Sequence, residues 1–116
     1  MKTLQILSRT KNAARHKQDK LMETVKPLSD FFKAIENDYR ISSTHIGIYA
    51  ALLYYRILNG FVNPVAAYRS QVMALAKISA PQTYRKCLND LTDYGYLRYV
   101  PSFKKNQPSK IYFNDP

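Results

Sequence analysis

The sequence of 116 residues contains few of the residue types on which catalytic and metal chemistry depends. It has one cysteine, two histidines and three glycines. Cys87, His16 and His45 are scattered, without the ligand spacing of a zinc site or of a nucleophile and its base. The glycines fall at turns or inside a helix and make no phosphate-cradling loop. The sequence therefore predicts a protein that is not an enzyme and has no metal or cofactor.

Acidic residues are also scarce, with eight Asp and Glu against 18 Lys and Arg, a net charge of +10. The eight acids form no cluster suited to two-metal chemistry. Residues 1–20 carry six basic and one acidic residue, residues 21–39 two and four, and residues 40–116 ten and three. A balance of this kind is typical of nucleic-acid-binding proteins, although an anionic membrane surface or simple solubility also accounts for it.

Long hydrophobic runs are missing. The longest, residues 46–55, is too short to span a bilayer, and residues 4–7 are too short a run for a secretory signal. An unpaired cysteine indicates a reducing compartment. We expect a bacterial, cytoplasmic protein without membrane association.

The length fits one domain, which we place at residues 19–116 behind a basic flexible arm at residues 1–18. Apolar residues at steps of four and three predict an amphipathic helix from Leu21 to Tyr39. Its stripe is Leu21, Val25, Leu28, Phe32, Ile35 and Tyr39. This stripe packs on the domain's own core or forms a homodimer contact.

Two further helices and a short strand follow. The first, residues 44–58, has capping hydroxyls before it, ends at Asn59-Gly60, and is apolar nearly all round, which is typical of a central helix. Gly47 inside it indicates a close helix contact. A loop with Pro64 leads into a short strand, and residues 69–77 form the next helix, which buries Val72, Met73 and Leu75.

Residues 79–94 show the clearest helix pattern. Ser79 and Gln82 have the spacing of a capping box, Pro81 fits the first turn, and Gly95 suits a left-handed stop. The inward-facing side chains are Tyr84, Leu88 and Leu91. Residues 96–100 and 110–113 then predict a hairpin, with Tyr99 and Tyr112 paired across it.

A recognition-type helix over residues 80–94 that leads into a basic hairpin, with a wing at residues 101–109, is the outline of a winged helix-turn-helix. The predicted fold class is mainly α with a small β-hairpin wing. Arg, Gln, Asn and Thr side chains suit base edges in the major groove, while Lys and helix N-termini suit phosphates. The candidate DNA-binding residues are Gln82, Thr83, Arg85, Lys86 and Asn89 on the helix, Lys104 and Lys105 on the wing, and Arg69 and Ser70 on the preceding helix.

The segment from Ile78 to Val100, with Thr83-Tyr84-Arg85-Lys86-Cys87-Leu88 and Asp93-Tyr94-Gly95-Tyr96-Leu97, resembles the recognition helix and first wing strand of winged-helix regulators of the MarR type. Residues 45–111 are similar to short bacterial winged-helix proteins carried on mobile elements and to amino-terminal domains of DnaD-like replication proteins. The resemblance implies base or phosphate contacts for Gln82, Thr83, Arg85 and Lys86, and it places Lys104 and Lys105 on the wing. In these proteins a small capping residue is more usual at the position of Tyr68.

The leading hypothesis is a sequence-specific protein that binds double-stranded DNA and regulates transcription. One alternative is a DNA-binding accessory factor of replication or of a mobile element. A second alternative is a winged-helix module that binds an acidic protein and not DNA.

Overall fold

The computed structural model describes residues 25–104 and 106–114, and the chain divides into two compact units, residues 1–33 and 34–116. The predicted arm at residues 1–18, the start of the helix at Leu21 and the wing residue Lys105 lie outside the described residues. No helix in the described part is long and apolar enough to cross a membrane.

Residues 25–34 are helical. Phe31 is the buried aromatic of this helix, and its ring lies 6.1 Å from that of Phe32, which is 48% exposed. The prediction that the helix continues to Tyr39 is wrong, because Tyr39 lies in a turn and is 93% exposed. The Asp38 carboxylate accepts the backbone N–H of Arg40 at 3.2 Å, which stabilises this turn in place of another helical turn.

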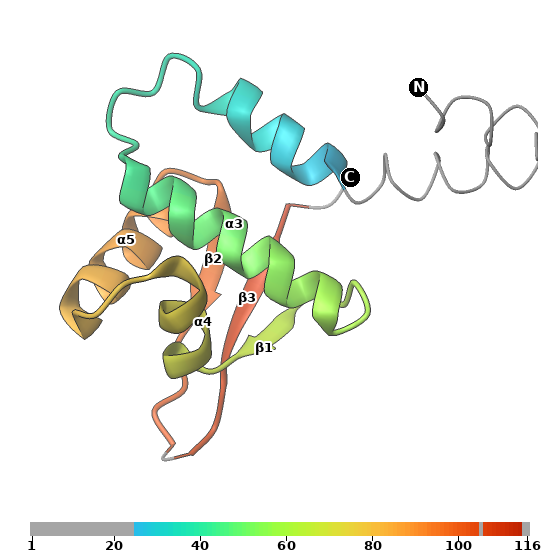
Figure 1. Cartoon of the computed structure of the whole chain (residues 1–116), viewed down its shortest axis with the longest axis vertical. Helices are drawn as coiled ribbons and strands as arrows, with labels where there is room; N and C mark the ends of the chain where they lie inside the picture. Colours follow the sequence, from blue (N-terminus) through green and yellow to red (C-terminus); the bar gives the residue numbers. More distant parts are fainter. Residues whose placement is uncertain (1–24, 105, 115–116) are drawn as a thin grey trace, which may run out of the picture. The chain divides into compact units, whose positions relative to one another are not determined.

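The helix α3, Ser43–Leu58, confirms the prediction for residues 44–58. Ser42 is its N-cap and forms a capping box with His45, which takes the position that Glu or Gln usually occupies. At the other end Asn59 is the C-cap, and Gly60 has a φ of 82°. Because α3 contacts β1, α4 and α5, it is the central helix of its unit (Figure 1).

The strands β1 (Val65–Ala67), β2 (Leu97–Val100) and β3 (Ser109–Phe113) form a three-stranded antiparallel sheet with the order β1-β3-β2 (Figure 1). The predicted pairing of Tyr99 with Tyr112 is wrong by one residue. Tyr99 pairs with Ile111, and Arg98 pairs with Tyr112 and lies 4.0 Å above its ring. Since neighbouring side chains alternate between faces, Tyr99 and Tyr112 lie on opposite faces of the sheet.

The helix α4, Arg69–Ala76, begins after Tyr68, whose side chain makes no capping bond. Val72 and Met73 are buried as predicted, but Leu75 is 38% exposed, so its predicted burial is wrong. The eight residues of α4 make only two turns, and the buried side chains already fill the stripe that faces the core. Lys77 then ends the helix in the left-handed conformation, with a φ of 61°.

The helix α5, Pro81–Asp93, lacks the predicted capping box of Ser79 and Gln82. Pro81 occupies the first helical position, and a proline keeps the residue before it extended. Ala80 is therefore the N-cap, and no side chain caps this end. The predicted stripe is confirmed, because Tyr84, Leu88 and Leu91 are all buried. Gly95 follows with a φ of 84°, as expected.

A polar cluster fixes the segment that enters α3. The Asp38 carboxylate accepts hydrogen bonds from the Arg40 guanidinium, at 2.8 Å from both Nε and Nη2, and from the Tyr96 hydroxyl at 2.5 Å. The Arg40 guanidinium also lies 3.9 Å above the ring of Tyr94. The hydrogen bonds from Arg40 and Tyr96 hold the pKa of Asp38 well below its usual range.

This lowered pKa predicts acid sensitivity. Because the folded-state pKa of Asp38 is below the unfolded value of about 3.9, its stabilisation is complete above the unfolded value and is lost as the pH falls from there through the lower folded-state pKa. We expect Asp38→Asn to be less stable than the parent chain at about pH 7, and the difference to shrink below about pH 4. Urea unfolding over this pH range measures both; a pH-independent difference would contradict the prediction.

Gly47 was expected to mark a close helix contact, and this is wrong. A Cβ atom built at Gly47 meets nothing within 4 Å. We therefore expect Gly47→Ala to stabilise the chain by about 0.5–1 kcal/mol, since alanine is the better helix former.

Gly95 is the matched control for this substitution. A Cβ at Gly95 also meets nothing within 4 Å, but its φ of 84° disfavours any side chain. Gly95→Ala should therefore destabilise the chain by roughly 1 kcal/mol. Thermal and urea unfolding measure both variants, and the same sign of change in the two would contradict the argument.

Candidate nucleic-acid interface

The outer face of α5 carries the predicted helix residues. Burial of the stripe turns the other side of the helix toward solvent, and all five predicted residues of α5 are exposed: Gln82, Thr83, Arg85, Lys86 and Asn89. No acidic residue lies in the first turn of the helix. The outer face of α5 therefore presents amide, hydroxyl and cationic groups to solvent.

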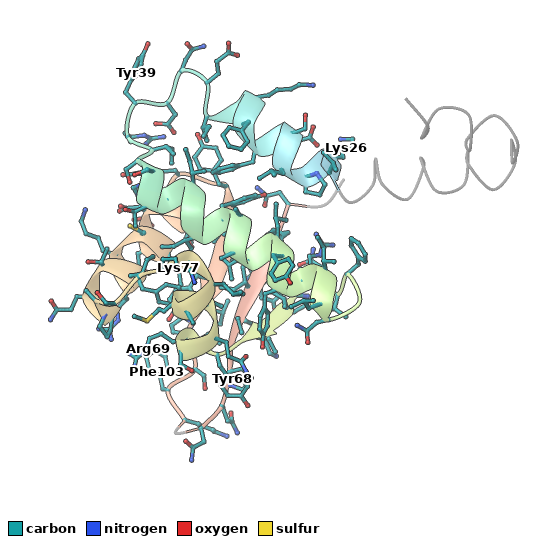
Figure 2. The ribbon with its side chains drawn as sticks, viewed as in Figure 1. Lys26, Tyr39, Tyr68, Arg69, Lys77 and Phe103 are labelled. Carbon is teal, nitrogen blue, oxygen red and sulfur yellow. The ribbon has the colours of Figure 1, made fainter. Side chains whose placement is uncertain are left out.

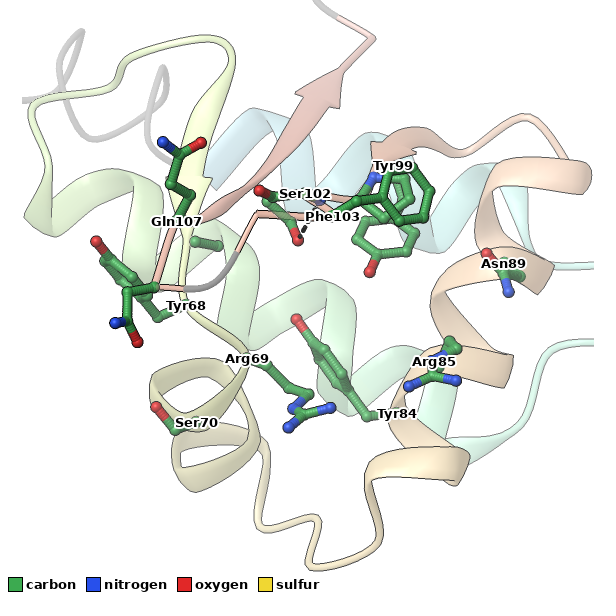
Figure 3. Close-up of a pocket in the computed structure, with 14 residues that line it drawn as sticks. Tyr68, Arg69, Ser70, Tyr84, Arg85, Asn89, Tyr99, Ser102, Phe103 and Gln107 are labelled. Carbon is green, nitrogen blue, oxygen red and sulfur yellow. Dashed lines mark hydrogen bonds between the residues drawn. The ribbon is translucent and has the colours of Figure 1, made fainter.

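A groove of about 640 Å³ lies between this face, the start of α4 and the hairpin (Figure 3). Arg69 and Ser70 line it from α4, while Arg85 and Asn89 line it from α5. Figure 2 shows Arg69 at the same end of the 34–116 unit as the hairpin loop. Four of the nine predicted residues therefore meet at one groove, although they come from two helices.

Four other predicted residues that the structure describes lie outside the groove lining. Gln82, Thr83 and Lys86 are exposed on α5, and Lys104 is exposed in the loop between β2 and β3. The Lys86 ammonium lies 3.9 Å from the Asp90 carboxylate one turn along the helix. These residues extend the polar surface beyond the groove.

Aromatic side chains form much of the groove wall. No local pattern in the sequence predicted that these rings would line a groove. Tyr68, Tyr84, Tyr99 and Phe103 all line it (Figure 3). Burial, and to a lesser degree the neighbouring Tyr99, raises the pKa of Tyr84, so its phenol keeps its proton and can donate a hydrogen bond. For Phe103, the one feature of the sequence that could have indicated a role is its place as an apolar residue in an otherwise polar hairpin loop.

A buried cluster behind this face joins α3 to α5. His45, Cys87 and Asp90 have donor atoms within 4.8 Å of one another, a grouping that their sequence spacing did not indicate. The backbone N–H of Ser42 donates to His45 Nδ1 at 2.9 Å, so the ring proton lies on Nε2. That Nε2 then donates to Asp90 Oδ2 at 2.9 Å. Within this arrangement the imidazole is a hydrogen-bonded link between two helices.

Cys87 is the third member of this cluster. Burial, together with the neighbouring Asp90 carboxylate, raises the pKa of its thiol. A raised pKa keeps the sulfur protonated, whereas nucleophiles and metal ligands need the thiolate. Its burial at 6% exposure accounts for its presence as a small core residue.

Comparison with known proteins adds no relative. No protein-family model, no curated protein and no solved structure matches the chain. The groove and the outer face of α5 are therefore the features from which a function can be inferred.

The two hydrogen bonds of the His45 ring predict that this residue stabilises the packing of α3 against α5. His45→Ala removes both the capping acceptor and the bond to Asp90, and we expect a loss of about 2–3 kcal/mol in the free energy of unfolding. His45→Gln keeps a side chain that can accept the Ser42 N–H, so it should lose less. Urea unfolding compares the two variants; equal losses would show that the cap contributes nothing.

Proposed function

We propose that this chain is a winged helix-turn-helix protein that binds double-stranded DNA and regulates transcription. One observation carries the proposal: Arg69, Ser70, Arg85 and Asn89 meet at a groove between α5 and a basic hairpin. The order α3, β1, α4, α5, β2, β3 supports it, because α4, the short turn and α5 have the order of a helix-turn-helix, and β2 and β3 follow in the order expected for a wing.

The outer face of α5 suits the major groove. An α-helix with its side chains is about 10–12 Å wide, which matches a major groove about 12 Å wide. Arg85 and Asn89 are one turn apart and project from the same side of α5 (Figure 3). Arg pairs with guanine O6 and N7, and Asn pairs with adenine N6 and N7. Gln82 and Thr83 lie at the amino-terminal end, which enters the groove first in helix-turn-helix proteins.

The groove beside α5 suits one sugar–phosphate strand. When α5 occupies the major groove, the hairpin loop faces the adjacent minor groove, and the strand that separates the two grooves passes between them. Arg69 and Ser70 at the start of α4 would contact its phosphates, because a guanidinium, a hydroxyl and helix N–H groups all suit phosphate oxygens. Lys104 supplies a further phosphate contact from the loop.

Dimerisation through the predicted Leu21–Tyr39 helix, of which residues 25–34 are helical, stays a hypothesis, and so does a cytoplasmic location. Val25 is 46% exposed and Phe32 is 48% exposed, so this helix has apolar side chains that a second copy of the chain could cover. Sedimentation at micromolar concentration tests it, and a monomer throughout would exclude it.

Selection from a random duplex pool at near-physiological salt tests the proposed function. An enriched motif is the expected result, and a two-fold symmetric motif would also indicate that the chain binds as a dimer. Retention of DNA without enrichment would favour the replication or mobile-element factor. No retention would overturn DNA binding and favour the protein-interaction module.

Substitutions separate base reading from phosphate binding. Arg85→Ala should weaken binding by about 1–3 kcal/mol and relax preference at one base pair. Lys104→Ala should weaken all sequences alike and lower the slope of log K against log salt by about one. Binding isotherms at several salt concentrations, on the selected and a scrambled duplex, measure both effects.

Arg98→Ala is the matched control, because it also removes one positive charge. Arg98 lies on the sheet face opposite the buried side chains of β2 and β3, stacked on Tyr112. It should leave affinity and preference nearly unchanged. An equal, sequence-independent loss for all three variants would contradict the assigned roles.

A further inference from the structure

The hairpin loop presents an apolar ring that no phosphate contact explains. Phe103 is 95% exposed. Single apolar side chains on a protein surface are common, so exposure by itself indicates nothing. Phe103, however, lines the groove that also contains Arg85 and Asn89, and it is followed directly by Lys104. A benzyl group has no conventional hydrogen bond to offer a phosphate, so at a nucleic-acid surface it packs on sugars or stacks on bases.

Two long hydrogen bonds and two prolines restrict the backbone on either side of Phe103. Ser102 N–H donates to Ser109 Oγ at 3.4 Å, across the base of the loop, and Lys104 N–H donates to Ser102 Oγ at 3.3 Å. Pro101 and Pro108 stand at the two ends of the loop and restrict its backbone. These constraints present the ring without a large loss of chain entropy on binding.

The position of the ring fits the duplex of the proposed function. In Figure 3, Phe103 projects from the loop on the side of the groove where α5 lies. With α5 in the major groove, the loop and its ring face the adjacent minor groove. Proteins that enter the minor groove often insert an apolar side chain between two base pairs, which unstacks them and bends the duplex.

We propose that Phe103 is such a wedge: it inserts between base pairs from the minor groove and bends the bound duplex toward the major groove. Lys104, beside it, would neutralise a phosphate at the bend. Unstacking is easiest at pyrimidine–purine steps such as TA and CA. The proposal, which rests on the proposed function, therefore adds a preferred flexible step at a fixed distance from the bases that α5 reads.

The test uses the full chain and the duplex enriched by selection. The duplex is labelled at both ends for energy transfer and carries 2-aminopurine at the flexible step. We expect the parent chain to shorten the end-to-end distance and to raise 2-aminopurine fluorescence. Phe103→Ala should abolish both signals and weaken binding roughly 5- to 100-fold, the range for lost base–aromatic stacking. Phe103→Leu, which keeps an apolar wedge, should retain part of the bend.

Arg98→Ala is the matched control, because it changes the same hairpin on the sheet face away from the groove. At saturating protein it should bend the duplex as the parent chain does. Thermal unfolding of Phe103→Ala should match the parent chain, since the ring is exposed.

The outcomes distinguish the wedge from the proposed function. A parent complex that binds its motif on a straight duplex overturns the wedge alone, and so does Phe103→Ala with an unchanged bend. Tighter binding of single strands than of duplex also overturns it and points to stacking on unpaired bases. Failure of the parent chain to bind any duplex overturns both.

Discussion

Burial of one side of α5 is the constraint on which the rest of the unit depends. Leu88 and Leu91 are fully buried and Tyr84 nearly so, and α5 contacts α3, the central helix. A helix that buries this stripe has its rotation about its own axis fixed, so its polar side must face solvent. The bond from His45 to Asp90 fixes the same rotation a second time, through a polar contact. The candidate interface is thus a by-product of core packing.

The sheet supplies the second wall of the groove. Strand β3 lies between β1 and β2, and its pairing with both determines where the loop between β2 and β3 begins. Tyr99 faces the same side of the sheet as the buried Ile111, so its ring enters the groove, whereas Arg98 faces the other side. The alternation along β2 therefore separates Tyr99, which lines the groove, from Arg98, which does not.

Local patterns in the sequence predicted the elements well and their mutual contacts poorly. The steps of four and three in α5, its proline start and its glycine stop reproduced the helix within two residues at either end. Pro81 also indicates that Ser79 is not the N-cap, because a proline keeps the residue before it, here Ala80, in an extended conformation. The register of Tyr99, the meeting of His45 with Asp90 and the groove shared by Arg69 and Arg85 depend on contacts between distant segments, which no local period encodes.

The strand order has a consequence for the order of events during synthesis. The middle strand of the sheet is β3, which is translated last of the three, while β1 at the edge is translated first. Until the ribosome has released Phe113, β1 and β2 have no strand between them, and the apolar side of α3 lacks part of its cover. The helices α3, α4 and α5 can therefore emerge and gain helical structure early, but the wall that completes the groove closes in one late step.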